Sequence, residues 1–130
     1  MSQQIEVVAA VIRRDDQVLL AQRPKGKHLE GLWEFPGGKV ESTESYEEAL
    51  VRECEEELDI TLENLELIHS VRFEYPEKTV LIRFFMSLSF KGEPKGLEGQ
   101  PLKWCLIDDL QPDWFPAANR EVIKILQKDY

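Results

Sequence analysis

Three glutamates in the first half of the chain have a spacing that suits metal chemistry. Glu53, Glu56 and Glu57 stand three and four residues apart, so on a helix they project to the same side. Like charges at this spacing repel one another, and a position beside a buried face makes each carboxyl group harder to ionise. A divalent cation such as Mg²⁺ reverses this effect because it binds carboxylate oxygens and keeps several waters. The glutamates therefore predict a metal site.

The sequence around these glutamates predicts the helix that positions them. Ser45, followed three residues later by Glu48, has the form of a capping box, so we expect the helix to begin near Ser45. Arg52 lies one step round from Glu53 and Glu56 and is placed to orient their carboxylates through hydrogen bonds. At about 100° per residue, the apolar face of this helix consists of Tyr46, Leu50, Val51, Cys54 and Leu58.

For the glutamates alone, a solvated acidic face is the simpler interpretation. Two glycines ahead of the helix, Gly37 and Gly38, favour a site instead, because glycine lets the backbone come close to a ligand or ion. Pro36 adds an extended approach to this glycine pair. The glycines and the spacing together outweigh the simpler interpretation.

This segment resembles the Nudix box, whose pattern is Gly-x5-Glu-x7-Arg-Glu-aliphatic-x-Glu-Glu-x-Gly-aliphatic. The positions that correspond to it are Gly38, Glu44, Arg52, Glu53, Cys54, Glu56, Glu57, Asp59 and Ile60. Cys54 replaces an aliphatic residue, a role that a small buried hydrophobic residue can fill. Asp59 replaces the closing glycine at the helix C-cap, where a positive φ is expected and Asp is tolerated. Neither departure falls on an expected metal ligand.

Length and composition indicate one domain over residues 1–130. Of the 130 residues, 42% are hydrophobic, which is enough for a compact core. The formal net charge of −9 opposes binding to a nucleic-acid backbone, so we expect no nucleic-acid partner. Neither a signal peptide nor an apolar run of membrane-spanning length is visible. Cys54 and Cys105 are expected to be reduced core residues of a cytoplasmic protein. We also expect a monomer without a membrane partner.

The remaining sequence predicts several strands and a second helix. Apolar or alternating residues indicate strands over 5–12, 17–21, 65–75, 79–90 and 102–106, with turns at 15–16 and 76–78. A helical turn is expected at 108–111. The last helix has its apolar positions at Val122, Ile123, Ile125 and Leu126. We therefore expect an α/β (α+β) domain with a mixed β-sheet sandwiched between α-helices, which is the Nudix fold that the box implies.

Outside the box, three segments resemble the MutT-type branch of the Nudix hydrolases. They are residues 33–39, which lead into the box, the acidic loop over 92–101, and residues 115–119 ahead of the last helix. The resemblance implies hydrolysis of 8-oxo-dGTP, and of other nucleoside triphosphates, to the monophosphate and pyrophosphate. Such an enzyme sanitises the nucleotide pool and prevents mutation. These outer segments are less specific than the box, which alone implies only hydrolysis of a nucleoside diphosphate linked to another group.

The resemblance assigns metal ligands and catalytic groups. Mg²⁺, with Mn²⁺ as a substitute, is expected to be held by Glu53, Glu56, Glu57, Glu98 and the Gly37 carbonyl. The cations bridge phosphate oxygens and lower the pKa of a bound water, which attacks the β phosphorus. Glu53 is the expected general base, and Glu98 is its rival. Lys39 and Arg23 neutralise phosphate charge, while Glu44 supports the loop before the helix.

The resemblance also assigns the base pocket. Asn119 is the expected reader because an amide presents a donor beside an acceptor, which complements the N–H of 8-oxoguanine where guanine has an acceptor. For Asn119 taken alone, a helix N-cap is the alternative. The other expected substrate contacts are Arg23, His28, Glu34, Phe35, Pro36, Gly37, Gly38 and, lining the pocket, Tyr75 or Lys78.

Two other functions stay open at this stage. Residues 6–10 and 21–24 also resemble Nudix relatives that cleave CTP, dCTP or other nucleoside diphosphate derivatives, although the segment around Asn119 argues against them. A non-catalytic nucleotide-binding module with the same fold is the more remote alternative. Such a module is expected to lose the metal carboxylates, and all three helix glutamates are present here.

Overall fold

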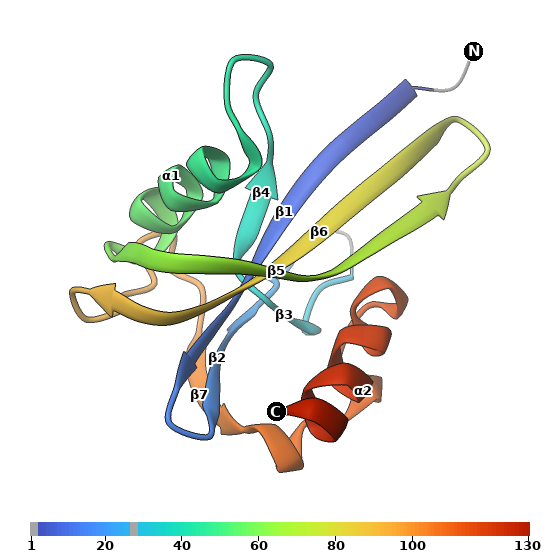
Figure 1. The fold of residues 1–130 in the computed structure, drawn as a ribbon. Helices are drawn as coiled ribbons and strands as arrows, with labels where there is room; N and C mark the ends of the chain where they lie inside the picture. Colours follow the sequence, from blue (N-terminus) through green and yellow to red (C-terminus); the bar gives the residue numbers. More distant parts are fainter. Residues whose placement is uncertain (1–2, 27–28) are drawn as a thin grey trace.

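The computed structural model describes residues 3–26 and 29–130. Their strands form one mixed sheet, and two α-helices pack beside it (Figure 1). The strands are β1 (Gln3–Arg14), β2 (Gln17–Gln22), β3 (Trp33–Glu34), β4 (Gly37–Lys39), β5 (Thr61–Glu74), β6 (Lys78–Lys91) and β7 (Leu102–Leu106). The helices are α1 (Tyr46–Leu58) and α2 (Arg120–Asp129), and three 3-10 turns precede α2: η1 (Ile107–Asp109), η2 (Pro112–Trp114) and η3 (Ala117–Asn119).

The first strand is the centre of the sheet. β1 pairs in parallel with β6 and antiparallel with β2 and β4, in the order β3-β2-β1-β6-β5. β7 pairs with β2. Residues 8–12 of β1 are all buried, as expected for a continuous apolar run that is covered on both faces. The prediction of a mixed sheet is confirmed.

Helix α1 begins and ends as the sequence predicts. Ser45 is the N-cap, and it forms the reciprocal capping box with Glu48. Asp59 closes the helix in the left-handed conformation with φ 59°, so aspartate takes the place of the expected glycine. Leu50, Cys54 and Leu58 are buried against the sheet, as is Ala49.

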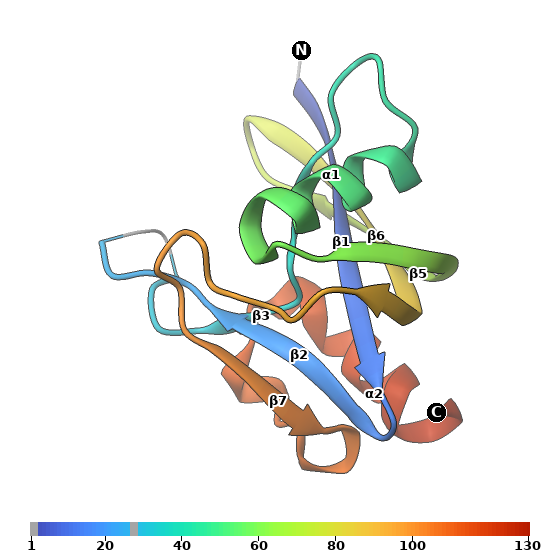
Figure 2. The same cartoon turned by 90° about the vertical axis from the view of Figure 1, so that its left-hand side faces the viewer.

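Each face of the sheet is covered by one helix, so the predicted sandwich is confirmed (Figures 1 and 2). On the α1 side the core includes Val8, Leu50, Cys54, Leu58 and Phe85. On the α2 side the core includes Phe35, Phe84, Phe115, Ile123 and Leu126. Cys54 and Cys105 are both free and buried, as predicted. Within the described residues, no helix combines the length and the apolar character needed to cross a membrane.

The structure differs from the sequence prediction in the short strands β3 and β4, which were not predicted, and in the start of β5. β5 begins at Thr61, ahead of the predicted residue 65. Its side-chain alternation is broken twice, because Asn64 has a positive φ of 54° and the pairing with β6 shifts between Leu67 and His69. A β-bulge moves later side chains to the other face, so a search for strict alternation finds only part of the strand.

Candidate active site

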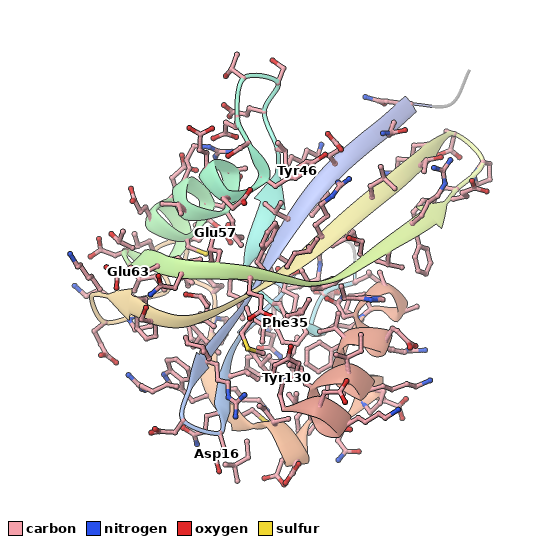
Figure 3. All side chains as sticks on the ribbon, in the orientation of Figure 1. Asp16, Phe35, Tyr46, Glu57, Glu63 and Tyr130 are labelled. Atoms are coloured by element: carbon pink, nitrogen blue, oxygen red, sulfur yellow. The ribbon has the colours of Figure 1, made fainter. Side chains whose placement is uncertain are left out.

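The half-buried carboxyl group of Glu57 has an unusual environment on the acidic helix. Its Oε2 atom is buried and has no hydrogen-bond partner among the described residues. In Figure 3, Glu57 lies on the side of α1 that faces the sheet. Burial, hydrogen bonding to Glu53 and the nearby charges of Glu53, Glu98 and Glu34 raise the pKa of Glu57 to about 9. These carboxylates therefore lie close enough together to oppose one another's ionisation.

Arg52 organises the other acidic groups of α1. Its Nε and Nη2 atoms donate a bidentate pair of hydrogen bonds to Glu44, at 2.6 and 3.0 Å. Its Nη1 atom donates to Glu53 at 3.1 Å and to Glu56 at 3.3 Å, and Nη2 also reaches the Lys39 carbonyl at 3.2 Å. The hydrogen bonds from Arg52 lower the pKa of Glu44 and keep that carboxylate charged. One guanidinium thus ties the glycine segment, the loop before α1 and the helix glutamates together.

Glycine is required at both positions ahead of the loop. A Cβ atom on Gly38 would overlap the carboxyl group of Glu53, and one on Gly37 would overlap the backbone of Val8 in β1. The glycines thus let β4 pair with β1, and they also let the Glu53 carboxylate lie against Gly38 of β4. This close approach is the physical reason for the glycine pair that the sequence analysis singled out.

The acidic loop that follows β6 is docked on the C-terminal end of α1. The backbone N–H groups of Lys95 and Leu97 donate to the carbonyls of Leu58 and Glu57, at 2.9 and 3.0 Å. The side-chain amide of Gln100 donates to the same Glu57 carbonyl. Figure 2 shows this segment (orange) beneath the end of α1. The loop therefore satisfies the last helix carbonyls and carries the exposed Glu98 beside Glu57.

A cleft of about 300 Å³ opens next to the acidic helix. Its lining includes the predicted residues Arg23, Glu34, Phe35, Gly37, Gly38, Tyr75 and Asn119. The volume is at the lower end of the range of small-molecule sites. Another hollow, of about 290 Å³, lies at the start of α1, but it is lined by Glu6, Glu41, Glu44 and Glu47. Four carboxylates disfavour an anionic ligand, so the first cleft is the better candidate for a nucleotide.

In the cleft, Arg23 and Glu34 form an ion pair with each other, whereas the Asn119 side chain makes no capping hydrogen bond. Arg23 and Glu34 form an ion pair at 2.6 Å, with each side chain about two-thirds buried. Burial raises the pKa of Glu34, while the Arg23 guanidinium opposes that rise. Asn119 is at the end of η3, and its side chain makes no capping hydrogen bond to α2. Asn119 is nevertheless the N-cap residue of α2 by position, so the helix N-cap alternative holds for its backbone but not for a capping bond from its side chain.

Other predicted residues lie at the margins of the site. Lys39 is exposed at the end of β4, and Glu56 on α1 is also exposed. Pro36 is buried, and its carbonyl accepts a hydrogen bond from the Ala10 N–H at 2.7 Å. Lys78 does not line the cleft, but its Nζ atom lies 5.7 Å from the ring centroid of Tyr75, which does. His28 lies outside the described residues.

Sequence reasoning missed several parts of the site. The β1 residues Val7 to Ala9 and Ile82 of β6 form part of the cleft, yet their apolar runs indicate only buried strands. Gln100 was missed because its hydrogen bond to the Glu57 carbonyl reaches across 43 positions of the chain. No local signal in the sequence identifies such a contact.

The donor set fits a hard divalent cation, although the ligands are not fully gathered. A buried, unpartnered carboxylate oxygen on Glu57 beside Glu53 is the kind of group that a cation would satisfy. Among residues 3–26 and 29–130, however, no three acidic, histidine or cysteine side chains converge closely enough to form a complete metal cluster. Coordination of one cation by these carboxylates would therefore require side-chain movements, most simply of the exposed Glu56 and Glu98.

Comparison with known proteins decides the family. The model of the NUDIX domain matches residues 3–126, nearly the whole chain. The chain belongs to the NUDIX domain family. This Nudix protein is 34% identical over 125 residues to the 8-oxo-dGTP diphosphatase of Escherichia coli, with 95% of this chain and 97% of that protein covered. It is 46% identical over 101 residues to the CTP pyrophosphohydrolase of the same organism, with 78% and 75% covered.

Solved structures agree with this family. The MutT NUDIX hydrolase from Burkholderia pseudomallei superposes on this Nudix protein with a TM-score of 0.84 and 33% sequence identity. The match covers 95% of this chain and 98% of that structure. Nudix hydrolases generally need divalent metal ions, in agreement with the carboxylates gathered on α1.

Proposed function

We propose that this Nudix protein hydrolyses 8-oxo-dGTP to 8-oxo-dGMP and pyrophosphate with the help of Mg²⁺. The observation that carries the proposal is the direct connection between the base cleft and the acidic helix. Gly38 lines the cleft and also lies against the Glu53 carboxyl group. Glu34 lines the cleft and raises the pKa of Glu57. A nucleotide in the cleft therefore has a path for its phosphates to the carboxylates.

The proposed metal ligands are Glu53, Glu56, Glu57, Glu98 and the Gly37 carbonyl. A bound Mg²⁺, or Mn²⁺ in its place, would supply charge neutralisation on the phosphates and acidify a water. Arg52 positions Glu53 and Glu56 by the hydrogen bonds described above. Glu44 keeps Arg52 in place through its bidentate contact. Arg52 thus holds the Glu53 and Glu56 carboxylates beside each other before the substrate enters, and the remaining ligands would have to move to complete the site.

Proton transfer from the attacking water is assigned to a carboxylate of this cluster. Glu53 is the first candidate because Arg52 donates a hydrogen bond to its carboxyl group and Gly38 leaves room for that group beside β4. Glu98 is the alternative, since it is exposed on a loop and close to Glu57. Lys39 at the end of β4 and Arg23 in the cleft are the cations proposed to face the phosphates.

Selection of the oxidised base is assigned mainly to Asn119. Its amide lines the cleft and makes no capping bond to α2, so it is available for a purine edge. Phe35 contributes backbone groups from the opposite wall, and Glu34 adds a carboxylate acceptor. His28 is the remaining predicted contact. Buried polar groups whose hydrogen bonds are all satisfied only by 8-oxoguanine disfavour guanine. Guanine would leave one of these groups without a hydrogen-bond partner.

A pyrimidine nucleotide is the second candidate substrate. The 46% identity to a CTP pyrophosphohydrolase favours it, although that match covers less of this chain than the match to the 8-oxo-dGTP diphosphatase. The chemistry at the phosphates would be the same, and only the role of Asn119 would change. In either case we propose a single-domain monomer that acts on the cytoplasmic nucleotide pool.

The reaction class is tested by product analysis. 8-oxo-dGTP is incubated with the protein and Mg²⁺, and parallel samples receive a chelator or the Glu57→Gln variant. The proposal expects 8-oxo-dGMP and pyrophosphate in equal amounts, formed only with the cation and the wild-type residue. Formation of the diphosphate and orthophosphate instead, or product formation in the presence of the chelator, would overturn it.

A further inference from the structure

Lys103 occupies an unusual position between two tryptophan rings. Its Nζ atom lies 4.6 Å from the ring centroid of Trp33 and 4.2 Å from that of Trp114. We call this group the Trp33–Lys103–Trp114 clamp. A cation over an aromatic face is attracted by the ring quadrupole, and here one ammonium group is attracted to two rings. In the described part of the chain, the lysines that form ion pairs with carboxylates are Lys91, Lys95 and Lys124.

The three residues of the clamp come from three different elements. Trp33 of β3 is paired with Gln22 of β2, and Lys103 of β7 is paired with Leu20 on the other side of β2. Both therefore have fixed places in the sheet. Trp114 is in η2, a 3-10 turn outside the sheet. The ammonium group of Lys103 thus attaches this irregular segment to the sheet.

Each tryptophan of the clamp is next to one wall of the cleft. Trp33 directly precedes Glu34 and Phe35 on one wall, and Trp114 is two residues before Pro116 on the other. Phe35 also stacks on Phe115, with ring centroids 5.4 Å apart and planes at 23°. The clamp and this ring stack therefore both connect the segment of Trp33 and Phe35 with the segment of Trp114 and Phe115. Together they set the distance between Phe35 and the segment that ends at Asn119.

We propose that Lys103 is a positioning residue that fixes the spacing of the two cleft walls and so sets the selectivity between purine bases. This inference rests on the proposed function, because the selectivity concerns 8-oxo-dGTP and dGTP. Lys103 itself does not line the cleft. Its effect passes through Trp33 and Trp114 to the placement of Phe35 and Asn119. Small displacements of hydrogen-bonding groups weaken discrimination between two bases of the same shape.

The test compares kcat/KM for 8-oxo-dGTP and dGTP in Lys103→Met and Lys103→Arg variants. Methionine keeps the length and apolar stem of the side chain but removes its charge, whereas arginine keeps a cation that can stack on tryptophan. We expect Lys103→Met to lower the selectivity ratio by about fivefold to tenfold, the size expected for lost cation–π contacts. The lower selectivity of Lys103→Met should come mainly from a higher KM for 8-oxo-dGTP. The selectivity ratio of Lys103→Arg should be close to that of the wild type.

Arg14 provides a matched control elsewhere in the molecule. Its guanidinium carbon lies 4.1 Å from the ring centroid of Trp104, and neither residue lines the cleft. Arg14→Met removes a comparable cation–π contact, together with an exposed ion pair to Glu93 that contributes little stability. The selectivity ratio of this variant should equal that of the wild type. Thermal unfolding and circular dichroism verify that each variant is folded.

The failure of the Lys103 role and the failure of the proposed function can be told apart. An unchanged ratio in folded Lys103→Met, or an equal fall in Arg14→Met, overturns the role of Lys103 while the proposed function stands. A wild-type protein that does not prefer 8-oxo-dGTP overturns the proposed function itself and the selectivity role with it. If Lys103→Met does not fold, Trp114→Phe replaces it, because phenylalanine keeps an aromatic face of weaker cation affinity. The same fall in ratio is then expected.

Discussion

The side-chain amide of Gln100 donates a hydrogen bond to the backbone carbonyl of Glu57 at 3.1 Å. Its Oε1 atom accepts a second hydrogen bond from the backbone N–H of Glu98 at 2.9 Å. One glutamine side chain therefore connects the end of α1 to the loop residue that is proposed to complete the metal shell. The connection predicts that Gln100 controls metal binding without contacting the metal.

Replacing Gln100 by alanine is expected to raise the Mg²⁺ concentration for half-maximal activity by about tenfold, as for the loss of other supporting groups around metal ligands. Gln127→Ala is the matched control, because Gln127 also donates to two backbone carbonyls, those of Ile107 and Leu110. A Mg²⁺ titration of activity makes the comparison. Equal midpoints for Gln100→Ala and wild type would contradict the prediction. In a Glu98→Gln background, Gln100→Ala should add no further shift.

Glu57→Gln tests the buried carboxylate itself. The substitution removes one negatively charged metal ligand, so we expect kcat at saturating Mg²⁺ to fall by about 100-fold or more. This loss is larger than the one expected for a residue that only supports a ligand. The fold should persist, because glutamine resembles the protonated carboxyl group that a pKa of about 9 implies near neutral pH. Steady-state kinetics and thermal unfolding measure the two effects. Turnover near the wild-type value would remove Glu57 from the metal site.

Metal binding is expected to release a proton near neutral pH. Because the pKa of Glu57 is raised to about 9 in the metal-free protein, its carboxyl group carries a proton there, and a cation must displace it. Mg²⁺ affinity should therefore rise with pH until the pH passes about 9. Isothermal titration calorimetry in two buffers of different ionisation enthalpy counts the protons released. Identical binding enthalpies in both buffers would refute this expectation, and Glu57→Gln should show no release from this position.

Asn119→Ala tests the reading of the base. A bidentate amide contact to a purine is worth about 1–3 kcal/mol of discrimination, so the preference for 8-oxo-dGTP over dGTP should fall by about fivefold to 150-fold. Hydrolysis of dGTP should change much less. The Asn119 side chain makes no capping bond, so the stability of α2 should be almost unaffected. A preserved selectivity ratio, measured as kcat/KM for both nucleotides, would point to a different reader.

Features governed by local rules were predictable from the sequence. The capping box of Ser45 and Glu48 and the left-handed Asp59 both follow from short-range backbone chemistry, and the structure has both. β7 has the predicted bounds because turn signals delimit a short apolar run. The spacing of Glu53 and Glu57 also follows directly from helix periodicity. These parts need no knowledge of the rest of the molecule.

Features that depend on tertiary contacts were not predictable. The Lys103 ammonium meets two tryptophans only because β3 and β7 flank the same strand and η2 folds back over them. The sequence also left Asn119 with two interpretations, since an asparagine before a helix suits both a cap and a ligand contact. In the structure Asn119 is the N-cap residue of α2 and also lines the cleft, and its side chain makes no capping hydrogen bond. Long-range packing thus decides the details on which substrate selection depends.

The most direct test of the account compares kcat/KM for 8-oxo-dGTP, dGTP, CTP and dCTP with Mg²⁺, using pyrophosphate release as the readout. The account predicts a large preference for 8-oxo-dGTP over all three others, with the nucleoside monophosphate as the second product. A preference for CTP or dCTP would contradict the assigned substrate and the role of Asn119, while it would leave the metal site and the reaction class unchanged.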